Sequence, residues 1–513
     1  MILEFNTLKD KILGCWNGKN IGGVLGAPLE GKRGVFDVDF YLQENLDKNP
    51  PPNDDLDLQI VWLGAAEKYG QQLTADILGE YWLTLITPNW NEYGRGKANL
   101  RGGLQPPLCG YVDNSYKNSC GCFIRSEIWA CLAPGNPALA VKYAYEDAVI
   151  DHGTDGMYGE LFCAALESAA FAEHDRDTLI AIGLSYIPED CLVAKAVKLA
   201  MECHQDGLTW QEARLRMMNE VPGTFGVQNG ISANAEGFPL EPAGNDAPNN
   251  IGLMMIGWLY GDGDFGKSLC IATNCGEDTD CTAGTLGAIL GILLGDSGLP
   301  EKWAAPIGGV INTNCIETTR ASLIGGIPAS VDELSDRILR TIPRFLDRQQ
   351  CDLLAEDGYT VKTAEDFFCH DREQRYLPGI GGNVEPYSVI GHEQFSPLAI
   401  RKDFHMFHLY LDHVDGVYLS PGRPTRLRLT VRATEHSYQQ WLNVQVYTPD
   451  WMQVQPGRCL SAPLQCTHYS PSIFEITLTA EEIKAGYADV LIDVSAEGRH
   501  TYGAIKTRLY LKG

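Results

Sequence analysis

Up to about residue 350, apolar residues recur at the spacing of amphipathic helices. We expect helices over residues 138–150, 158–173, 178–185, 192–203, 209–218 and 331–347. Asn136 followed by Pro137 is typical of an N-cap and a first helical turn, and Thr209 is a second predicted N-cap. Because no strand pattern alternates with these helices, we expect an all-α domain over residues 1–350 rather than a doubly wound α/β sheet.

Beyond about residue 397 the period of the apolar residues changes to two. Leu427, Leu429 and Val431 alternate with polar neighbours, and the same alternation recurs over 442–446, 474–478, 490–494 and 505–511. Such runs, separated by Gly, Pro and Asp, are typical of an antiparallel β-sandwich. The chain is therefore predicted to be multidomain: helical residues 1–350, a connector over 351–396 and a β-sandwich accessory domain over 397–513.

The net charge of the chain limits the kinds of partner molecule that it is expected to bind. Its 513 residues include 40 Lys and Arg against 66 Asp and Glu, a formal net charge of -26. Binding to a phosphate backbone needs a basic face, so no nucleic-acid partner is expected. The longest apolar stretch, 283–294, is too short to span a bilayer, so no membrane partner is expected either. The oligomeric state is left open.

Neither export nor disulfide bonding is expected. The first residues lack the basic start and apolar core of a secretory signal, which favours a cytoplasmic location. The 16 cysteines form no pair of C-x-x-C motifs at zinc spacing, and Cys120 and Cys122 make only C-x-C. In such a chain most cysteines are expected to be buried free thiols.

The first group of chemically interesting residues is Asn53-Asp54-Asp55-Leu56-Asp57, a loop that runs into an apolar helix. Adjacent carboxylates repel each other unless a cation or protons compensate. Helix capping is one interpretation, although three Asp and one Asn in five positions exceed what a cap needs. A site for Mg²⁺ or Ca²⁺ is the other, since carboxylate clusters commonly bind these ions.

A second Asp-rich turn spans residues 274–282 and carries Asp278 and Asp280 two positions apart. The helix expected after it has small residues at three- and four-residue steps: Ala283, Gly284, Gly287, Ala288, Gly291 and Gly295. Small residues at those steps allow close helix packing, so the helix is expected to be buried. Its carboxylates would then need a cation or hydrogen-bond donors. Helix capping again remains the alternative.

Residues 18–31 form a glycine-rich segment that contains Glu30 near its end. Its glycines could cradle a phosphate, but the segment is neither a Walker-type loop nor a strand-flanked G-x-G-x-x-G. Its spacing favours tight helix packing followed by a turn.

Taken in this order, these segments resemble the ADP-ribosylglycohydrolase family. Residues 22–30 are similar to the family's G-D-A-L-G-x-P-x-E, residues 53–56 to its T-D-D-T, and residues 276–281 to its G-G-D-T-D-T. Residues 121–125, followed by Ala133-Pro134, are similar to its small-residue, M-R and A-P segment. The resemblance covers roughly residues 8–345, and its specificity lies in four motifs that follow one another in the family's order.

The resemblance implies an all-α fold, cleavage at the anomeric carbon of ADP-ribose and a binuclear Mg²⁺ centre. It makes Asp54, Asp55, Asp278 and Asp280 metal ligands and places Glu30 beside the scissile bond. Glu30, as general base or proton shuttle, and Asp55 are therefore the predicted catalytic residues. A surface turn carboxylate is the other interpretation of Glu30.

Four of the chain's departures from the family motifs concern the metal site. Gly23 replaces the first motif's Asp, Asn53 and Leu56 replace the two Thr of T-D-D-T, and Cys281 replaces the last Thr of D-T-D-T. The amide oxygen of Asn53 can still bind a hard cation, whereas Leu56 cannot and a Cys sulfur suits Mg²⁺ poorly. Thr282 is a predicted ligand if the turn shifts by one residue. One metal position is therefore open to loss or to another ion, such as Mn²⁺ or Ca²⁺.

Four residues are predicted to bind substrate. Trp90 could stack on a base or a sugar, while Trp82 in the same segment is equally well explained as core. Arg125 matches the arginine of the family's M-R segment, and the resemblance makes it a predicted substrate-binding residue. His152 and Asp155 are candidates for the pocket wall, with a capped turn as the alternative.

The leading prediction is a metal-dependent hydrolase that cleaves a glycosidic bond in ADP-ribose or an ADP-ribosyl adduct, with a small-molecule or ADP-ribosylated substrate. A hydrolase of another glycoside, nucleoside-like or furanosyl, is the first alternative, because accessory sandwiches are common on carbohydrate-active enzymes. A non-catalytic ligand-binding member of the fold is the second, and the retained Asp residues and Glu30 argue against it.

Overall fold

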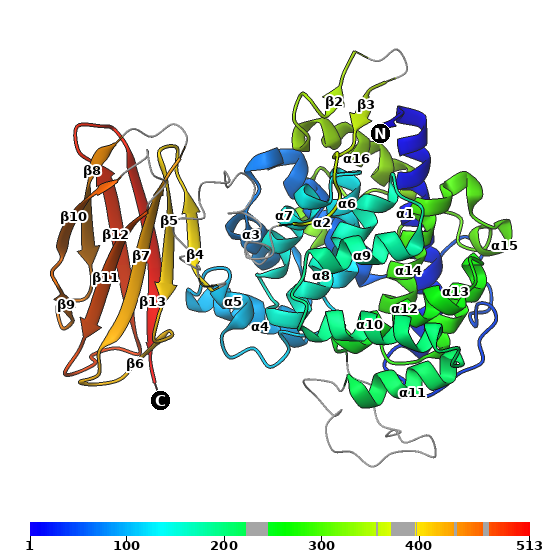
Figure 1. The fold of residues 1–513 in the computed structure, drawn as a ribbon, viewed down its shortest axis with the longest axis horizontal. Helices are drawn as coiled ribbons and strands as arrows, with labels where there is room; N and C mark the ends of the chain where they lie inside the picture. Colours follow the sequence, from blue (N-terminus) through cyan, green and yellow to red (C-terminus); the bar gives the residue numbers. More distant parts are fainter. Residues whose placement is uncertain are drawn as a thin grey trace. The chain divides into compact units, whose positions relative to one another are not determined.

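The computed structural model describes residues 1–221, 245–354, 358–370, 396, 398–434, 439–464 and 471–512. The chain forms two compact units, which Figure 1 shows as mainly helices in one and mainly strands in the other. The first unit comprises Met1–Lys97 and Asp113–Gly381, and the second comprises Ala98–Val112 and Gly382–Gly513.

Helices make up most of the first unit, and all six predicted helices are present. Thr209 caps its helix in a capping box with Glu212, and Asn136 caps another, as predicted. None of the helices in the described ranges is both long and apolar enough to cross a membrane. The helices of the chain are α1 (Phe5–Gly26), α2 (Asp54–Tyr69), α3 (Ala75–Leu85), α4 (Asn91–Gly102), α5 (Leu108–Tyr111), α6 (Glu127–Leu132), α7 (Pro137–Ala148), α8 (Thr154–Ala170), α9 (Arg176–Ser185), α10 (Leu192–Gln205), α11 (Trp210–Glu220), α12 (Ala247–Tyr260), α13 (Phe265–Asn274), α14 (Thr279–Leu294), α15 (Glu301–Ala304) and α16 (Val331–Phe345).

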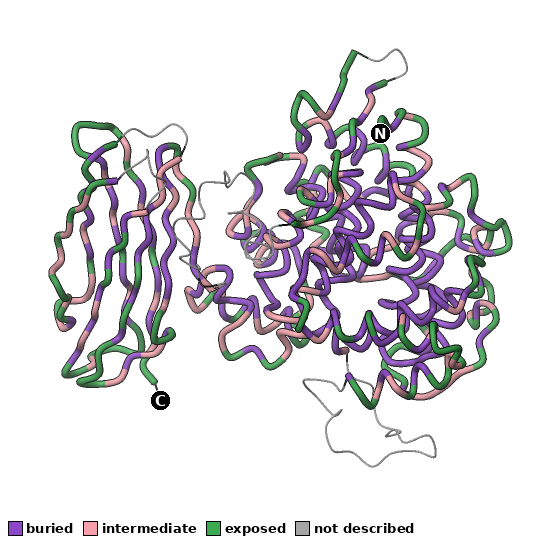
Figure 2. The backbone as a smooth tube through the Cα atoms, viewed as in Figure 1, coloured by how far each residue is buried: buried purple, intermediate pink, exposed green. Residues whose placement is uncertain are grey.

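Helices α1 and α14 pack backbone against backbone in the middle of the first unit. Every residue of α14 from Thr279 to Ile292 is buried, within the densely buried part of this unit in Figure 2. The predictions of a buried helix after the second Asp cluster and of tight packing by residues 18–31 are confirmed. Three glycines of α1 meet three small residues of α14 in register: Gly14 with Gly291, Gly18 with Gly287, and Gly22 with Ala283.

This packing brings two distant sequence segments together. At the end of α1, the carbonyl oxygen of Gly26 accepts a hydrogen bond from Thr279 Oγ1 at 2.8 Å. The 3-10 helix Ala27–Leu29 follows directly and leads to Glu30. The glycine-rich segment and the second Asp cluster therefore lie side by side.

The described start of the predicted connector is a small sheet that belongs to the first unit. Strands β2 (Cys351–Asp352) and β3 (Thr360–Lys362) pair with β1 (Ile2–Leu3) in the order β1-β3-β2, all antiparallel. Strands of two or three residues carry no readable period, which explains why the sequence pattern did not indicate them. Residues 371–395 of the predicted connector lie outside the described residues.

The second unit contains the predicted β-sandwich. Its two five-stranded sheets have the orders β10-β8-β12-β13-β6 and β4-β5-β7-β11-β9. All pairings are antiparallel except the short parallel pair of β13 with β6, which the sequence pattern did not foresee. The apolar residues of the alternating runs fill one shared core, except Leu511, which is exposed. The strands are β4 (Ile400–Asp403), β5 (Phe407–His413), β6 (Tyr418–Leu419), β7 (Thr425–Ala433), β8 (Gln440–Tyr447), β9 (Gln453–Gln455), β10 (Cys459–Leu464), β11 (Ser472–Thr479), β12 (Tyr487–Ala496) and β13 (Tyr502–Leu511).

A helical segment, Ala98–Val112, is part of the sandwich unit. Leu104 and Leu108 are buried in the apolar core of the sandwich. The carbonyl oxygen of Gly102 accepts a hydrogen bond from Arg508 Nη1 at 2.8 Å. The predicted division into residues 1–350 and 397–513 did not include this segment in the sandwich, because apolar helical residues have the same pattern whichever core they join.

The cysteines of the described residues are free thiols. All are buried except Cys369, which is half-buried, and Cys459, which is exposed. For this part of the chain the prediction of mostly buried free thiols is confirmed.

The packing of α1 on α14 can be tested by replacing Gly287 with Ala. Helix propensity alone favours Ala over Gly by roughly 1 kcal/mol. Here a Cβ at Gly287 would overlap the carbonyl oxygen of Gly18. We therefore expect Gly287→Ala to lower the free energy of unfolding by about 1–3 kcal/mol, measured by urea denaturation. Gly284→Ala in the same helix is the control, since a Cβ there would meet nothing closer than 3.5 Å. Equal stabilisation by both substitutions would contradict the packing described.

Candidate active site

A cavity of about 390 Å³ in the first unit is bordered by the starts of α2, α4 and α14. Both Asp clusters reach it, although they are far apart in the sequence. Its described lining residues are Gly23, Val24, Ala27, Glu30, Pro51, Pro52, Asn53, Asp54, Asp55, Trp90, Asn91, Glu92, Tyr93, Cys120, Gly121, Ile124, Asn245, Asp278, Asp280, Cys281 and Asn314.

The residues of the first cluster have two roles, capping a helix and lining the cavity. Asn53 caps α2, because its Oδ1 accepts a hydrogen bond from the backbone N–H of Asp55 at 2.9 Å. Asp54 and Asp55 follow in the first turn and line the cavity. Leu56 is buried and is not among the lining residues. The cap therefore needs the Asn side chain alone and leaves both Asp carboxylates for the cavity.

Asp57 does not line the cavity. It fixes a neighbouring loop instead. Its Oδ2 accepts hydrogen bonds from the backbone N–H groups of Asn314 and Cys315, both at 2.7 Å. Burial raises the pKa of Asp57 to about 7. The third Asp of the cluster thus fixes the loop that presents Asn314 to the cavity.

A strained turn places the second cluster. Gly276 and Glu277 have φ of 73° and 70°, a left-handed conformation that is uncommon for a residue other than Gly. The buried carboxylate of Glu277 is held by Arg33, whose Nε and Nη2 donate to it at 2.5 and 2.6 Å. Asp278 then occupies the N-cap position of α14 without making a capping hydrogen bond. Capping therefore does not account for the carboxylate of Asp278.

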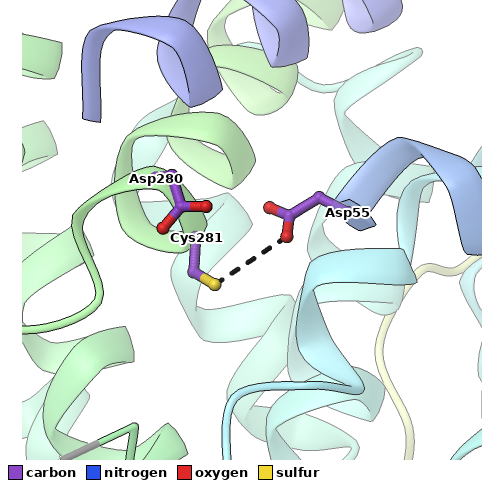
Figure 3. A group of neighbouring side chains, drawn as sticks. All are labelled: Asp55, Asp280 and Cys281. Atoms are coloured by element: carbon purple, nitrogen blue, oxygen red, sulfur yellow. Dashed lines mark hydrogen bonds between the residues drawn. The ribbon is translucent and has the colours of Figure 1, made fainter. Parts of the chain in front are cut away.

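The cavity carboxylates form two overlapping groups of potential ligands. Glu30, Asp278 and Asp280 form one group, and Asp55, Asp280 and Cys281 form the other. Within each group the ligand atoms lie within 4.8 Å of one another. Figure 3 shows Asp55 pointing from α2 toward Asp280 and Cys281 at the start of α14. Asp55 Oδ2 and Asp280 Oδ1 are buried without a hydrogen-bond partner among the described residues. Because such oxygens are costly to bury alone, this donor set fits a divalent cation.

Repulsion within the site adds to the cost of burial. Burial raises the pKa of Asp280 well above its ordinary value, and the charge of Asp278 adds to the rise. Burial raises the pKa of Asp55 in the same way, although the nearby ammonium of Lys19 opposes it. Lys19 Nζ lies 3.6 Å from Asp55 Oδ2 but only 2.7 Å from Glu127 Oε1, so its charge is shared. A bound cation would relieve the remaining repulsion.

Glu30 stands at the exposed rim of the cavity. Partial burial of its carboxyl group raises its pKa to about 7, and the charges of Asp278 and Asp54 add to the rise. A carboxyl group with such a pKa can take up or release a proton at neutral pH. Its membership of a ligand group with Asp278 and Asp280 distinguishes it from an isolated surface carboxylate.

Two departures from the family motifs are coupled in space. A Cβ at Gly23 would overlap Asn53 Nδ2. The Asn53 side chain therefore fills the space that a side chain at position 23 would need. In this chain, Asn53 therefore requires a residue without a side chain at position 23.

Cys281, and not Thr282, faces the cavity at the last motif position. Cys281 Sγ lies 3.9 Å from Asp55 Oδ1. Helix α14 begins at Thr279 without the one-residue shift that would bring Thr282 to the cavity. Instead, Thr282 Oγ1 donates to the carbonyl oxygen of Thr279 at 3.1 Å. The prediction of Thr282 as a metal ligand is therefore corrected, since its hydroxyl is used inside the helix.

Sequence reasoning missed Glu92, which lines the cavity from the first turn of α4. Its side chain is 93% buried, and Oε2 has no hydrogen-bond partner among the described residues. A Cβ at Gly121 would overlap Glu92 Oε1, so the glycine makes room for this carboxyl group. Burial raises the pKa of Glu92 to about 7 against the opposing influence of His152. The sequence signal that could have indicated Glu92 as a site residue is its position between the aromatic residues Trp90 and Tyr93.

A chain of buried polar groups runs inward from Glu92. The Ser119 hydroxyl hydrogen bonds to Glu92 and lies 2.9 Å from His152 Nε2. His152 Nδ1 lies 2.8 Å from Asp151 Oδ1. Although burial opposes it, Arg125 and His152 lower the pKa of Asp151, which favours its ionised carboxylate. The Ser119 hydroxyl therefore links Glu92 to the ring of His152.

Arg125 is not available to a substrate. Its side chain is fully buried, and its Nε donates to Asp147 Oδ1 at 2.9 Å while Nη2 donates to Asp151 Oδ1 at 2.7 Å. Nη1 donates to the backbone of Gly121. The predicted role in substrate binding is corrected, because these acceptors already satisfy the guanidinium away from the cavity.

His152 and Asp155 also lie outside the cavity lining. His152 is buried in the polar chain behind Glu92 and can reach a substrate only through that chain. Asp155 Oδ1 accepts hydrogen bonds from the backbone N–H groups of Leu192 and Val193 at the start of α10. The capped-turn interpretation therefore describes Asp155 correctly.

Aromatic rings form one side of the cavity. Trp90 and Tyr93 line it, with ring centroids 6.2 Å apart and planes inclined by 28°. Trp90 is half exposed and so keeps a ring face for a ligand. Trp82 is fully buried and packs against Tyr93, which confirms the interpretation of Trp82 as core.

Comparison with known proteins identifies the family of the chain. The family model described as ADP-ribosylglycohydrolase matches residues 5–339, a range that includes every described lining residue of the cavity. A solved structure described as "ADP-ribosylglycohydrolase-related protein complex" is 17% identical, with a TM-score of 0.38, over 65% of this chain and 99% of that one. A TM-score this low supports no conclusion about the fold. No curated protein matches the chain.

The buried position of Glu92 predicts a pH-dependent stability. Its folded-state pKa of about 7 lies above the ordinary value of 4.5, so folding favours the protonated form. The protein should therefore lose stability as the pH rises from about 4.5 through 7. Replacing Glu92 with Gln should remove up to about 3 kcal/mol of that loss, measured by urea denaturation in EDTA at pH 5 and pH 8. Glu301→Gln, an exposed change in α15, is the control and should keep the wild-type slope. An unchanged slope for Glu92→Gln would contradict the burial described.

Proposed function

Because the chain belongs to the ADP-ribosylglycohydrolase family, we propose that it hydrolyses a glycosidic bond at the anomeric carbon of ADP-ribose or of an ADP-ribosyl adduct. The observation that carries the proposal is the meeting of both Asp clusters in one cavity within the region that the family model matches. The expected substrate is a small molecule or an ADP-ribosylated group small enough to enter that cavity.

The proposed cofactor is a pair of divalent cations, with Mg²⁺ as the first candidate for an oxygen-only donor set. Asp54, Asp55, Asp278 and Asp280 would hold them, together with one carboxylate oxygen of Glu30. When bound, the cations would polarise substrate hydroxyl groups and offset the charge of the carboxylates.

Two carboxyl groups in the cavity suit the proton transfers that hydrolysis of a glycoside requires. The second carboxylate oxygen of Glu30 takes the proton of the attacking water as the water oxygen bonds to the anomeric carbon. Glu92 gives its proton to the leaving-group atom, which keeps the electron pair of the broken bond. Ser119 and His152 can then resupply Glu92 with a proton. Trp90 and Tyr93 provide the faces on which a base or sugar ring can rest.

One observation favours the second candidate, a hydrolase of a different glycoside. The described lining residues of the cavity include no Lys, Arg or His. Charge-assisted hydrogen bonds from such residues are the usual means of holding phosphate. An uncharged nucleoside-like or furanosyl substrate would not need them, so this candidate stays beside ADP-ribose.

The metal dependence is tested by release of free ADP-ribose from peptides ADP-ribosylated on arginine and on serine. We expect release with Mg²⁺, and at least about a hundredfold slower release in EDTA or after Asp278→Ala, because charge compensation worth several kcal/mol is lost. Asp206→Ala, an exposed change, is the control and should leave release unaltered. Full release in EDTA, from protein shown to be metal-free, would contradict the proposal.

The same preparation separates the two substrate classes. Release of ADP-ribose with no cleavage of neutral nucleosides or furanosides would support the first candidate. Cleavage of the neutral compounds alone would support the second and would agree with the absence of cationic side chains from the described lining.

The role of Glu92 is tested by varying the leaving group. Glu92→Gln should slow turnover by about 10²–10⁴-fold when the leaving group needs a proton, because a general acid is removed. With an acidic leaving group such as nitrophenol, the loss should be much smaller. Glu301→Gln serves again as the exposed control. Equal losses on both kinds of substrate would exclude proton donation by Glu92.

A further inference from the structure

The two ligand groups in the cavity differ in chemistry. Glu30, Asp278 and Asp280 offer only oxygen, whereas the second group joins the sulfur of Cys281 to the carboxylates of Asp55 and Asp280. Hard ions such as Mg²⁺ prefer oxygen donors, while a thiolate favours softer ions such as Zn²⁺. The two positions are therefore not equivalent, although they share Asp280.

The second group is more than a chance cluster of acidic residues. Asp55 is 99% buried and Asp280 is 93% buried. Each has one carboxylate oxygen without a hydrogen-bond partner among the described residues. Figure 3 shows both carboxylates and the sulfur pointing into the same small space. Cys281 Sγ contacts Asp55 Oδ1 at 3.9 Å, so the thiol stands where a cation between the carboxylates would meet it.

We propose that the cavity holds two different divalent cations, a hard ion of the Mg²⁺ class on Glu30, Asp278 and Asp280, and a thiophilic ion of the Zn²⁺ class on Asp55, Asp280 and Cys281. This inference rests on the metal site of the proposed function, but it requires no particular substrate. The hydroxyl-to-sulfur change at position 281 is then a change of metal preference and not the loss of a ligand.

The experiment uses Co²⁺ as the probe and the full chain prepared free of metal. Visible d–d bands report cobalt bound at either position, and an ultraviolet sulfur-to-cobalt charge-transfer band reports a thiolate ligand. We expect both signals in the wild-type protein. Cys281→Ser and Cys281→Thr should keep d–d bands but lose the charge-transfer band. Both variants should also bind Zn²⁺ at least about 10–100-fold more weakly in competition with a chromophoric chelator.

Cys120→Ser is the matched control, because Cys120 also lines the cavity and hydrogen bonds to Asp278. It should keep the charge-transfer band. Circular dichroism of each variant establishes that it is folded.

The outcomes separate this inference from the proposed function. Wild-type protein that binds cobalt without a charge-transfer band overturns the thiolate ligand but leaves an all-oxygen metal site intact. A band that survives in both Cys281 variants and disappears in Cys120→Ser assigns the sulfur to Cys120 and also overturns it. Absence of any cobalt binding removes the metal site itself and the proposed mechanism with it.

Discussion

The close contact of α1 with α14 sets the geometry on which the cavity depends. Three glycines on α1 bring the two backbones so near that a methyl group at Gly18 would collide with Gly287. The end of α1 is thereby fixed against Thr279, and Glu30 is carried to the carboxylates at the start of α14. Because the glycines of α1 have no side chains, the two helices approach closely. Residues from two distant segments can therefore contribute to one group of metal ligands.

The same packing concentrates negative charge in a place with little water. Lys19, about two turns before the end of α1, brings a buried ammonium to Asp55. Glu127 lies closer to this ammonium, and Gln59 also hydrogen bonds to Glu127. The carboxylates of the cavity are consequently left with more charge than the neighbouring cation offsets. Burial raises the pKa values of Asp55 and Asp280, and the neighbouring carboxylates add to the rise. A bound divalent cation would compensate this charge.

Much of the architecture could be predicted from the sequence because its signals are local. The glycine spacing, the capping residues and the period-two strands each express one preference of the backbone. The Asp clusters could be recognised for the same reason. The direction of a side chain could not: Arg125 is turned inward by Asp147 and Asp151, Thr282 bonds within its own helix, and Glu92 looks like an ordinary acid in a first helical turn. Those outcomes depend on contacts between segments that no local pattern encodes.

The membership of Ala98–Val112 in the sandwich unit has a consequence for how the chain is made. The core that covers Leu104 and Leu108 is formed by sandwich residues that follow about 300–400 positions later in the chain. At translation rates of about 5–20 residues per second, the segment waits for tens of seconds before its apolar side chains find their partners. During that interval the apolar side chains of the segment lack the core that buries them in the folded protein, and unburied apolar surface of this kind is what chaperones bind on unfinished chains.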